Sequence, residues 1–556
     1  MVMDGVVFGR VLTMAANGSG EADWIGAGDG VVTDVGNGPV DGCEAREMLD
    51  FGDRVVLPGF VDPHAHLEVS ARAGGTMVDV RVPRCRTVED VLDALRDGLH
   101  EGRHGSGWLR AQGNLFFNQK LADKRYPTLA ELDSVSSSVP IAVHAGGHTS
   151  LLNSAAIELA DLGRFTDRTK GSMGGAVIEM GSDGRPTGVV SEVDSLLPIR
   201  DPDDLDLAAV LTQGAHDLFT RYGVTLVGDI SGSPEGVREM VDLVESGRIP
   251  QRLEVFVCAP GTVDFEVALR RHELIPADAR RIRQHGVKVF SDGGYSSKNA
   301  ATHSAYRAPH AVRPGSRGKV NLDRRQLVAM MRRTAEAGLQ LAVHANGERA
   351  QDVVVHAAAQ VRAGMPDAPP TRVEHAGNLL TRPQALEGWR RAGIVPVPQP
   401  VFLYNFGDFF PTYLGPVAAS GRFPFRFLHD EGFAVAASSD VYVGAEDRQT
   451  NPFFGIWCCL RRQTFLGAIV EPEQAVTLEE ALRMYTINAA AALGLGDTFG
   501  SLEKGKAADL VVLDRDPRRC TVDELLDVQV DHVMVGGRLV HSREGAVPPS
   551  TRPPSR

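Results

Sequence analysis

The sequence predicts an α/β fold whose main domain is a parallel sheet or barrel, accompanied by a small β domain built from both ends of the chain. Apolar strand candidates alternate with amphipathic helical segments through the middle of the sequence, an order typical of parallel sheets. Short β-like runs lie near both termini. One interval between strand candidates is too long for a single strand–helix unit, which indicates an inserted subdomain.

Turns rich in Gly, Asn and Asp separate the β-like runs near the N-terminus, as in a small antiparallel sheet. The terminal strand candidates are residues 5–12, 30–35, 508–513 and 530–540. We expect residues 1–55 and 491–545 to form one composite β-sandwich. The tail at 546–556 is rich in Pro, Ser and Arg, and we expect it to be disordered.

The main domain is expected at residues 56–490, with helices near 325–337 and 351–363 between its strands. The interval from residue 67 to residue 224 exceeds one strand–helix unit, so we expect the inserted subdomain at about 70–222. The strand candidates of the main domain are residues 55–62, 225–229, 286–290, 339–344, 371–375 and 433–438.

Bulk properties exclude several classes of partner. The formal net charge is −13 and no long run of Lys or Arg occurs, so a nucleic-acid partner is not expected. No apolar stretch approaches the roughly 20 residues of a membrane span. The six cysteines are scattered without a CxxC pair, and Asp4 stands where a signal peptide would need a basic start. We therefore expect reduced thiols in a cytoplasmic protein.

The clearest chemical signal is the pair His64 and His66 at the end of a strand candidate. Residues two apart on a strand point to the same side, so the two imidazoles aim at one point. Imidazole is the commonest protein ligand for a metal ion. Two incidental histidines at a strand end would explain this pair equally well if it stood alone.

A series of metal-ligand residue types follows. Lys288 lies mid-strand, where a free ammonium group is costly to bury. His344 and His375 each end a strand candidate, and Asp440 follows another. Taken individually, Lys288 could belong to a partly buried ion pair, and Asp440 could be a helix N-cap. Jointly, these residues recur where barrel active sites are built, and they favour a metal site.

This ordered series resembles the amidohydrolase superfamily, whose barrels carry paired histidines, a lysine, two more histidines and a final aspartate in this order. Residues 486–490 and 500–513 are similar to the superfamily's closing segments. The closest branch is amidohydrolase family 3, the N-substituted formamide deformylase-like enzymes. The residues that carry the branch resemblance are Gly146-Gly147-His148, Asn153-Ser154, 186–192, 287–293, 343–350, 372–376 and Ser438-Ser439-Asp440.

Two departures from the branch pattern concern the substrate rather than the metal. Residues 294–297 read Gly-Tyr-Ser-Ser in place of a turn resembling Gly-Ser-Leu-Gly, and Asn346 stands where the branch usually has Asp.

The resemblance implies a (β/α)₈ TIM-like barrel with one or two divalent metal ions, expected to be Zn²⁺. His64, His66 and Asp440 would bind the more buried ion. Lys288 would be carboxylated and bridge two ions, and the second ion would be bound by His344 and His375. A metal-activated hydroxide would then cleave the C–N bond of a small N-substituted amide or formamide, with Asp440 moving the proton.

Other assignments stay open. His148 either polarises the scissile carbonyl or is a structural histidine. An aromatic stretch either lines an apolar substrate pocket or is a packed loop; its candidate substrate-binding residues are Phe402, Tyr404, Phe409 and Phe410. The same machinery serves cyclic amides, esters and deaminated rings. A metal-binding barrel without turnover is the non-enzyme alternative, against which Asp440 argues. A homodimer is left open.

Overall fold

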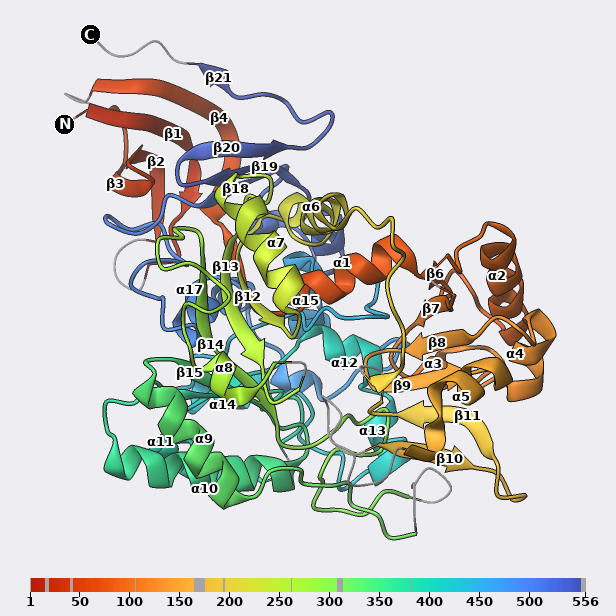
Figure 1. Cartoon of the computed structure of the whole chain (residues 1–556). Coiled ribbons are helices and arrows are strands. Elements are labelled where there is room, and N and C mark those ends of the chain that lie inside the picture. The colour runs from red at the N-terminus through yellow and green to blue at the C-terminus, as the bar shows by residue number, and fades with distance from the viewer. Residues whose placement is uncertain are drawn as a thin grey trace.

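The computed structural model describes residues 2–15, 20–40, 44–105, 107–164, 176–193, 196–261, 263–307, 314–380 and 382–551. The described strands form three separate sheets, which Figure 1 shows as a terminal sheet, a central sheet and a smaller sheet to one side.

The terminal sheet joins the two ends of the chain. Its order is β20-β19-β18-β4-β1-β2-β3, so the C-terminal strand β18 lies directly beside the N-terminal strand β4. The short β21 also pairs with β4, which means that the part of the expected disordered tail around residue 550 forms a strand instead. Residues 552–556 of that tail lie outside the described residues. The strands are β1 Val2–Leu12, β2 Glu21–Gly28, β3 Val31–Gly36, β4 Glu44–Pro58, β18 Leu510–Leu513, β19 Val530–Val535, β20 Arg538–Ser542 and β21 Ser550–Thr551.

The central sheet is parallel, in the order β17-β16-β15-β14-β13-β12-β5. Most of its residues are buried on both faces, which suits near-continuous apolar strands. The sequence predicted five of these strands and missed β13 and β17. The strands are β5 Phe60–Ala65, β12 Val224–Ser231, β13 Arg252–Cys258, β14 Ile282–Phe290, β15 Gln340–His344, β16 Thr371–Glu374 and β17 Ile394–Val397.

The strand expected at 433–438 is not a regular strand. Its backbone makes single hydrogen bonds to different neighbours instead of a continuous ladder. Ser438 N donates to the carbonyl of Pro398, just after β17, and Asp440 N donates to the carbonyl of His64 on β5. The described strands therefore form a curled seven-stranded sheet, and an irregular segment lies between its two edges.

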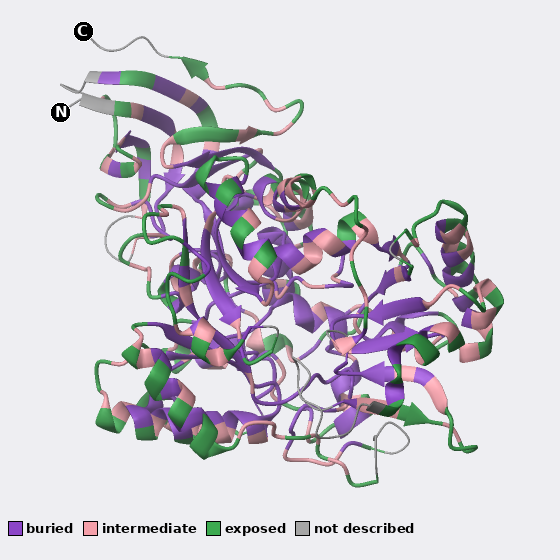
Figure 2. Cartoon of the chain, in the orientation of Figure 1, coloured by how far each residue is buried: buried purple, intermediate pink, exposed green. Residues whose placement is uncertain are grey.

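Helices pack around this sheet. The expected helices at 325–337 and 351–363 are confirmed as α9 Arg324–Glu336 and α10 Glu348–Gly364. Figure 2 shows buried inner strands and exposed outer faces on these helices. The remaining helices of the main domain are α1 Leu67–Thr76, α6 Leu207–Leu218, α7 Pro234–Glu245, α8 Phe265–Ala268, α11 Ala385–Ala392, α12 Val401–Phe406, α13 Phe409–Leu414, α14 Phe425–Asp430, α15 Pro452–Arg461, α16 Leu478–Met484 and α17 Ile487–Ala492.

The third sheet is built entirely from the interval where the sequence indicates an insertion. Its order is β10-β11-β9-β8-β7-β6, and it has its own hydrophobic cluster around α2. Its elements are β6 Val78–Asp79, α2 Val88–His100, β7 Leu109–Gly113, α3 Phe117–Lys120, α4 Leu129–Val135, β8 Ile141–Ala145, β9 Thr149–Leu152, α5 Ser154–Ala160, β10 Val177–Met180 and β11 Pro186–Ser191.

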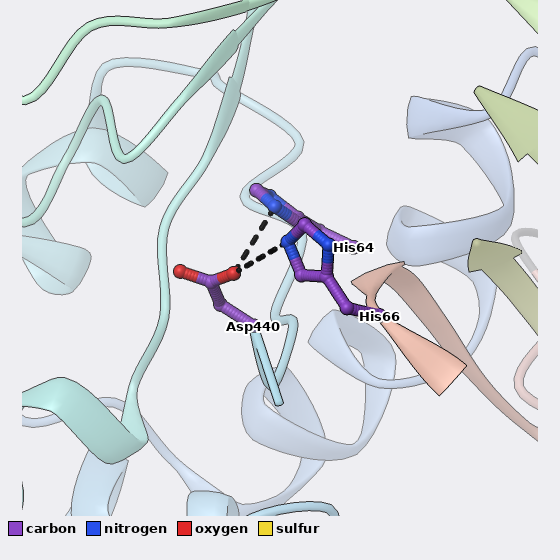
Figure 3. A group of neighbouring side chains, drawn as sticks. All are labelled: His64, His66 and Asp440. Carbon is purple, nitrogen blue, oxygen red and sulfur yellow. Dashed lines mark ion pairs between the residues drawn. The ribbon is translucent and has the colours of Figure 1, made fainter. Parts of the chain in front are cut away.

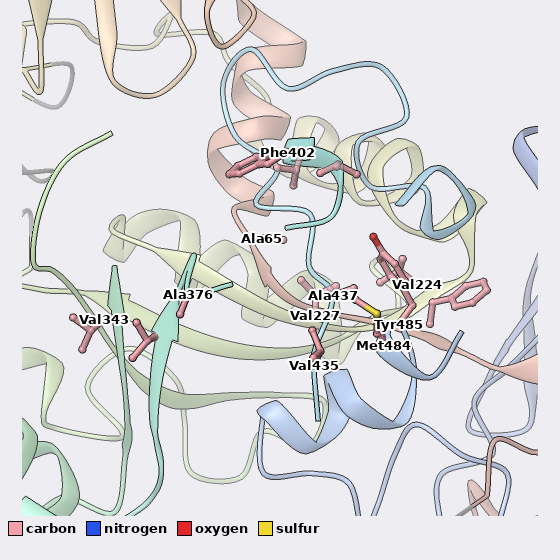
Figure 4. Packing of buried hydrophobic residues seen from close by; sticks show 14 of the residues in the cluster. Ala65, Val224, Val227, Val343, Ala376, Phe402, Val435, Ala437, Met484 and Tyr485 are labelled. Atoms are coloured by element: carbon pink, nitrogen blue, oxygen red, sulfur yellow. The ribbon is translucent and has the colours of Figure 1, made fainter. Parts of the chain in front are cut away.

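The large hydrophobic core lies around the central sheet. Figure 4 shows Val224 and Val227 of β12 near Ala437, Met484 and Tyr485. Tyr485 accepts a backbone hydrogen bond from β5 through its carbonyl, so the core also ties the C-terminal helices to the strand that carries the paired histidines. No helix among the described residues has the length and apolar character needed to cross a membrane.

Candidate metal centre and active site

Three predicted ligands converge at one edge of the central sheet. His64 Nε2 lies 3.2 Å from Asp440 Oδ1, and His66 Nε2 lies 3.3 Å from the same oxygen. Figure 3 shows both rings turned toward this carboxylate. The three ligand atoms lie within 4.8 Å of one another, so a single ion could contact all of them.

The partners of the other ring nitrogens indicate why a cation fits here. His64 Nδ1 lies 2.5 Å from Glu374 Oε2, and His66 Nδ1 lies 3.0 Å from the carbonyl of Ile230. If the proton of each neutral ring is on Nδ1, facing these oxygens, each Nε2 has a lone pair. Three acceptors then face one another, an arrangement that a bound divalent metal ion stabilises.

The protonation states agree with metal ligation. Burial raises the pKa of Asp440, but its interactions with His64 and His66 outweigh burial and hold the pKa well below its usual range. Burial lowers the pKa of His66. The carboxylate is therefore anionic while the His66 ring is neutral, as metal ligands must be.

The other two predicted histidines form a second facing pair. His375 Nε2 lies 3.0 Å from His344 Nδ1. His375 Nδ1 lies 2.8 Å from Gln399 Oε1, and His344 Nε2 lies 3.3 Å from the carbonyl of Gly293. The acceptor on Gln399 leaves a lone pair on His375 Nε2. His344 Nε2 lies near both the carbonyl of Gly293 and the amide nitrogen of Asn346, which is 3.2 Å away. Burial lowers the pKa of His375 to about 3 and that of His344 well below its usual value.

Lys288 links the two groups from the middle of β14. Its Nζ lies 3.3 Å from His64 Nε2, and the residue is 1% exposed. Burial lowers the pKa of this amine, which favours the neutral, nucleophilic form. Lys288 lines the same cavity as the predicted histidine ligands.

The buried carboxylate of Glu374 contacts His64 on the Nδ1 side of its ring. Arg372 donates to both oxygens of Glu374 at 2.9 and 3.1 Å, and neither residue is exposed. Burial opposes ionisation of Glu374, yet the positive charge of Arg372 and the contact with His64 lower the pKa of Glu374 well below the usual range. Glu374 therefore contacts both the predicted ligand His64 and the guanidinium group of Arg372.

Every predicted ligand lines one cavity of about 490 Å³, together with His148. Its apolar wall includes Leu115, Phe116, Phe402, Phe406 and Tyr295.

The aromatic stretch reaches this cavity only in part. Phe402 lines it as predicted, and its ring stacks 6.3 Å from that of His375. Tyr404, Phe409 and Phe410, which were also candidates for substrate binding, lie outside this lining and pack elsewhere. Phe409 stacks behind Phe116, Phe410 packs against Tyr295, and Tyr404 contacts Phe454, Trp457 and Phe465.

His148 enters the cavity from the inserted subdomain, in the loop between β8 and β9. Its ring centroid lies 6.0 Å from that of His344. The sequence pattern does not indicate a partner for His148, although Glu192 ends one of the segments that carry the branch resemblance. The structure places Glu192 Oε2 3.1 Å from His148 Nδ1.

A model described as "Amidohydrolase family" matches residues 47–541 of this sequence. The chain belongs to the amidohydrolase family. This confirms the predicted resemblance and makes the protein a hydrolase acting on carbon–nitrogen bonds. The matched range includes all six predicted metal ligands.

Individual relatives agree with this placement. The amidohydrolase is 30% identical over 516 residues to the N-substituted formamide deformylase of Arthrobacter pascens, covering 90% of this chain and 91% of that protein. It is 25% identical to the Protein LONG AFTER FAR-RED 3 of Arabidopsis thaliana, over 84% of this chain and 79% of that protein. An uncharacterized metal-dependent hydrolase from Pyrococcus horikoshii OT3 shares the fold, with a TM-score of 0.69 at 21% identity over 93% of this chain and 99% of that chain.

Proposed function

We propose that this amidohydrolase uses a divalent metal ion to hydrolyse the C–N bond of a small, neutral N-substituted amide, with N-substituted formamides as the first candidates. The observation that carries the proposal is the convergence of His64 Nε2, His66 Nε2 and Asp440 Oδ1 inside the cavity. The similarity to an N-substituted formamide deformylase supports the same reaction class.

The residues present suit one or two ions, with Zn²⁺ as the candidate because its usual ligands are imidazoles and carboxylates. His64, His66 and Asp440 would hold the first ion. Lys288, carboxylated on Nζ, would join His344 and His375 in holding a second. Such an ion supplies Lewis-acid chemistry, polarising a carbonyl and making water more acidic. We also propose that the irregular segment around Ser438 closes the central sheet as the eighth position of a (β/α)₈ barrel.

In this proposal Asp440 moves the proton that hydrolysis requires. Its Oδ1 faces His64 and His66, while Oδ2 lies 3.9 Å from His375 Nδ1. Its anionic state suits it to accept a proton from the attacking water. The same proton is then delivered to the leaving nitrogen, which departs as a neutral amine.

The charges around the cavity favour a neutral substrate. Among the described lining residues there is no arginine, and Lys288 is the only lysine. Glu68 and Glu235 also line the cavity, and Glu235 is exposed. Within the part of the lining that the structure describes, Lys288 is therefore the only lysine or arginine that could meet a substrate carboxylate, whereas the aromatic wall can hold an apolar N-substituent.

A matched substrate panel tests this proposal. An N-benzylformamide, the corresponding acetamide, an N-formyl amino acid, a lactam and an ester are assayed with the purified protein and added zinc. We expect the highest kcat/KM for the neutral formamide, and no turnover by Asp440→Asn beyond a small residual rate. Preference for the N-formyl amino acid, the lactam or the ester would contradict the substrate assignment. Absence of turnover on all of them in metal-loaded protein would favour a binding role.

A further inference from the structure

His148 and Glu192 contact each other through both their side chains and their backbones. The side-chain contact runs from His148 Nδ1 to Glu192 Oε2 at 3.1 Å. The backbone N–H of Glu192 also donates to the carbonyl of His148 at 3.0 Å. His148 follows β8 and Glu192 follows β11, so two strands of the inserted subdomain present this pair to the central sheet.

The Glu192 carboxylate is fully buried, with a side chain that is 0% exposed. Its second oxygen accepts from Ser297 Oγ at 2.8 Å and from Gly294 N at 3.3 Å. Among the described residues its ion-pair partner is His148. A buried carboxylate is costly unless it is paired and hydrogen-bonded. The contacts with Ser297, Gly294 and His148 stabilise the Glu192 carboxylate in its buried position.

The backbone around the pair is also specialised. Glu192 has φ = 60°, in the left-handed region that a glutamate rarely adopts, and such strain is typical of functional sites. A Cβ at Gly294 would lie 2.6 Å from the His148 ring, and one at Gly293 would lie 2.7 Å from Glu192 Oε1. The two glycines after β14 therefore leave the space in which the pair sits.

We infer that Glu192 is a positioning residue that orients His148 toward the reacting amide. The contact between Nδ1 and Glu192 holds the ring in one orientation, and in that orientation His148 lines the cavity. His148 then contacts the substrate from the side of His344. The inference rests on the proposed function, and it assigns part of the active site to the inserted subdomain.

The two oxygens of Glu192 have different partners, which makes Glu192→Gln a sharp test. Gly294 N can only donate, so it favours the single oxygen of glutamine on its side, and Ser297 Oγ, which also lies 3.0 Å from the Gly294 carbonyl, can donate to that oxygen as well. The new NH₂ group then faces His148 Nδ1, so the ring must accept there and carry its proton on Nε2 instead. This substitution keeps the shape of the side chain while reversing the tautomer.

The experiment is a double-mutant cycle on the metal-loaded full chain with the best amide of the panel. We expect Glu192→Gln to lower kcat by about 10–100-fold, as for partners that orient a ligating or catalytic group, with little change in KM or metal content. Added imidazole should partly restore His148→Ala, and it should fail to do so in the His148→Ala/Glu192→Gln protein. Glu158→Gln, an exposed charge change on α5 of the same subdomain, should behave as the wild type.

Two readouts separate the possible failures. A kcat for Glu192→Gln within twofold of the wild type, or losses that add fully with those of His148→Ala, would overturn the inference. ¹⁵N NMR of labelled histidine reports the His148 tautomer without any substrate: Nδ1–H in the wild type and Nε2–H in Glu192→Gln. If the tautomer changes as expected but no amide is hydrolysed, the proposed function fails while the positioning by Glu192 stands.

Discussion

The backbone N–H of Asp440 donates to the carbonyl of His64 at 2.8 Å, while the Asp440 carboxylate lies 3.2 Å from Nε2 of the same histidine. Asp440 reaches this position with φ = 46°, in the left-handed region that aspartate and asparagine tolerate best among non-glycine residues. The backbone hydrogen bond therefore helps to set the spacing between these two candidate metal ligands.

Metal content provides the first prediction. Because three acceptors converge on one point, the purified protein should bind about one to two equivalents of zinc or a similar ion per chain. His64→Ala should lose most of this metal, whereas His356→Ala, on the exposed face of α10, should retain it. Elemental analysis and thermal unfolding with and without chelator provide the measurements. Full activity in a protein shown to be metal-free would refute the metal site.

Removal of the buried lysine is the second prediction. Lys288→Ala should lower kcat/KM by about 100-fold or more, on the scale of losing a group that supports a metal ion. Acetate or propionate should restore part of the activity by occupying the space of a carboxylated side chain. Lys288→Met fills that space and should not respond to either acid. Equal responses of the two variants would show that no anionic ligand is needed there.

The third prediction concerns proton transfer by Asp440. Asp440→Asn keeps a residue that tolerates the left-handed backbone and should retain the fold and much of the metal. Its kcat should fall by about 10²–10⁴-fold, the usual contribution of general acid–base catalysis. Steady-state kinetics with parallel metal analysis separates the two roles. A kcat within a few-fold of the wild type would mean that another group moves the proton.

Substrate size discrimination gives the fourth prediction. Phe402→Ala should weaken transition-state binding of a bulky formamide by about 1–3 kcal/mol relative to a small one, the scale of a lost apolar contact. Phe410→Ala removes a buried ring outside the cavity lining. It should lower the free energy of unfolding by about 3–5 kcal/mol without changing this ratio. Measurement of kcat/KM for both substrates tests this prediction. If Phe402→Ala lowers kcat/KM equally for the bulky and the small formamide, Phe402 has only a packing role.

The sequence by itself determined the order and chemistry of the candidate metal site. His64, His66, Lys288, His344, His375 and Asp440 were all identified, and all line one cavity. This was possible because parallel strands bring their C-terminal ends to one edge, so ligand types at strand ends become neighbours whatever separates them in sequence. The helices α9 and α10 were also predictable from the sequence, because their apolar residues recur with helical spacing.

Only the tertiary structure decided the contacts that depend on packing. Residues 433–438 have a strand-like composition, but their backbone groups form hydrogen bonds with several different segments instead of one neighbouring strand. Composition does not predict which segments these are. Phe402 and Phe410 are both buried aromatics, and the packing of α12 and α13 determines which one meets the cavity. The contact between His148 and Glu192 likewise depends on strand pairing and a left-handed backbone, neither of which is encoded by the residue types alone.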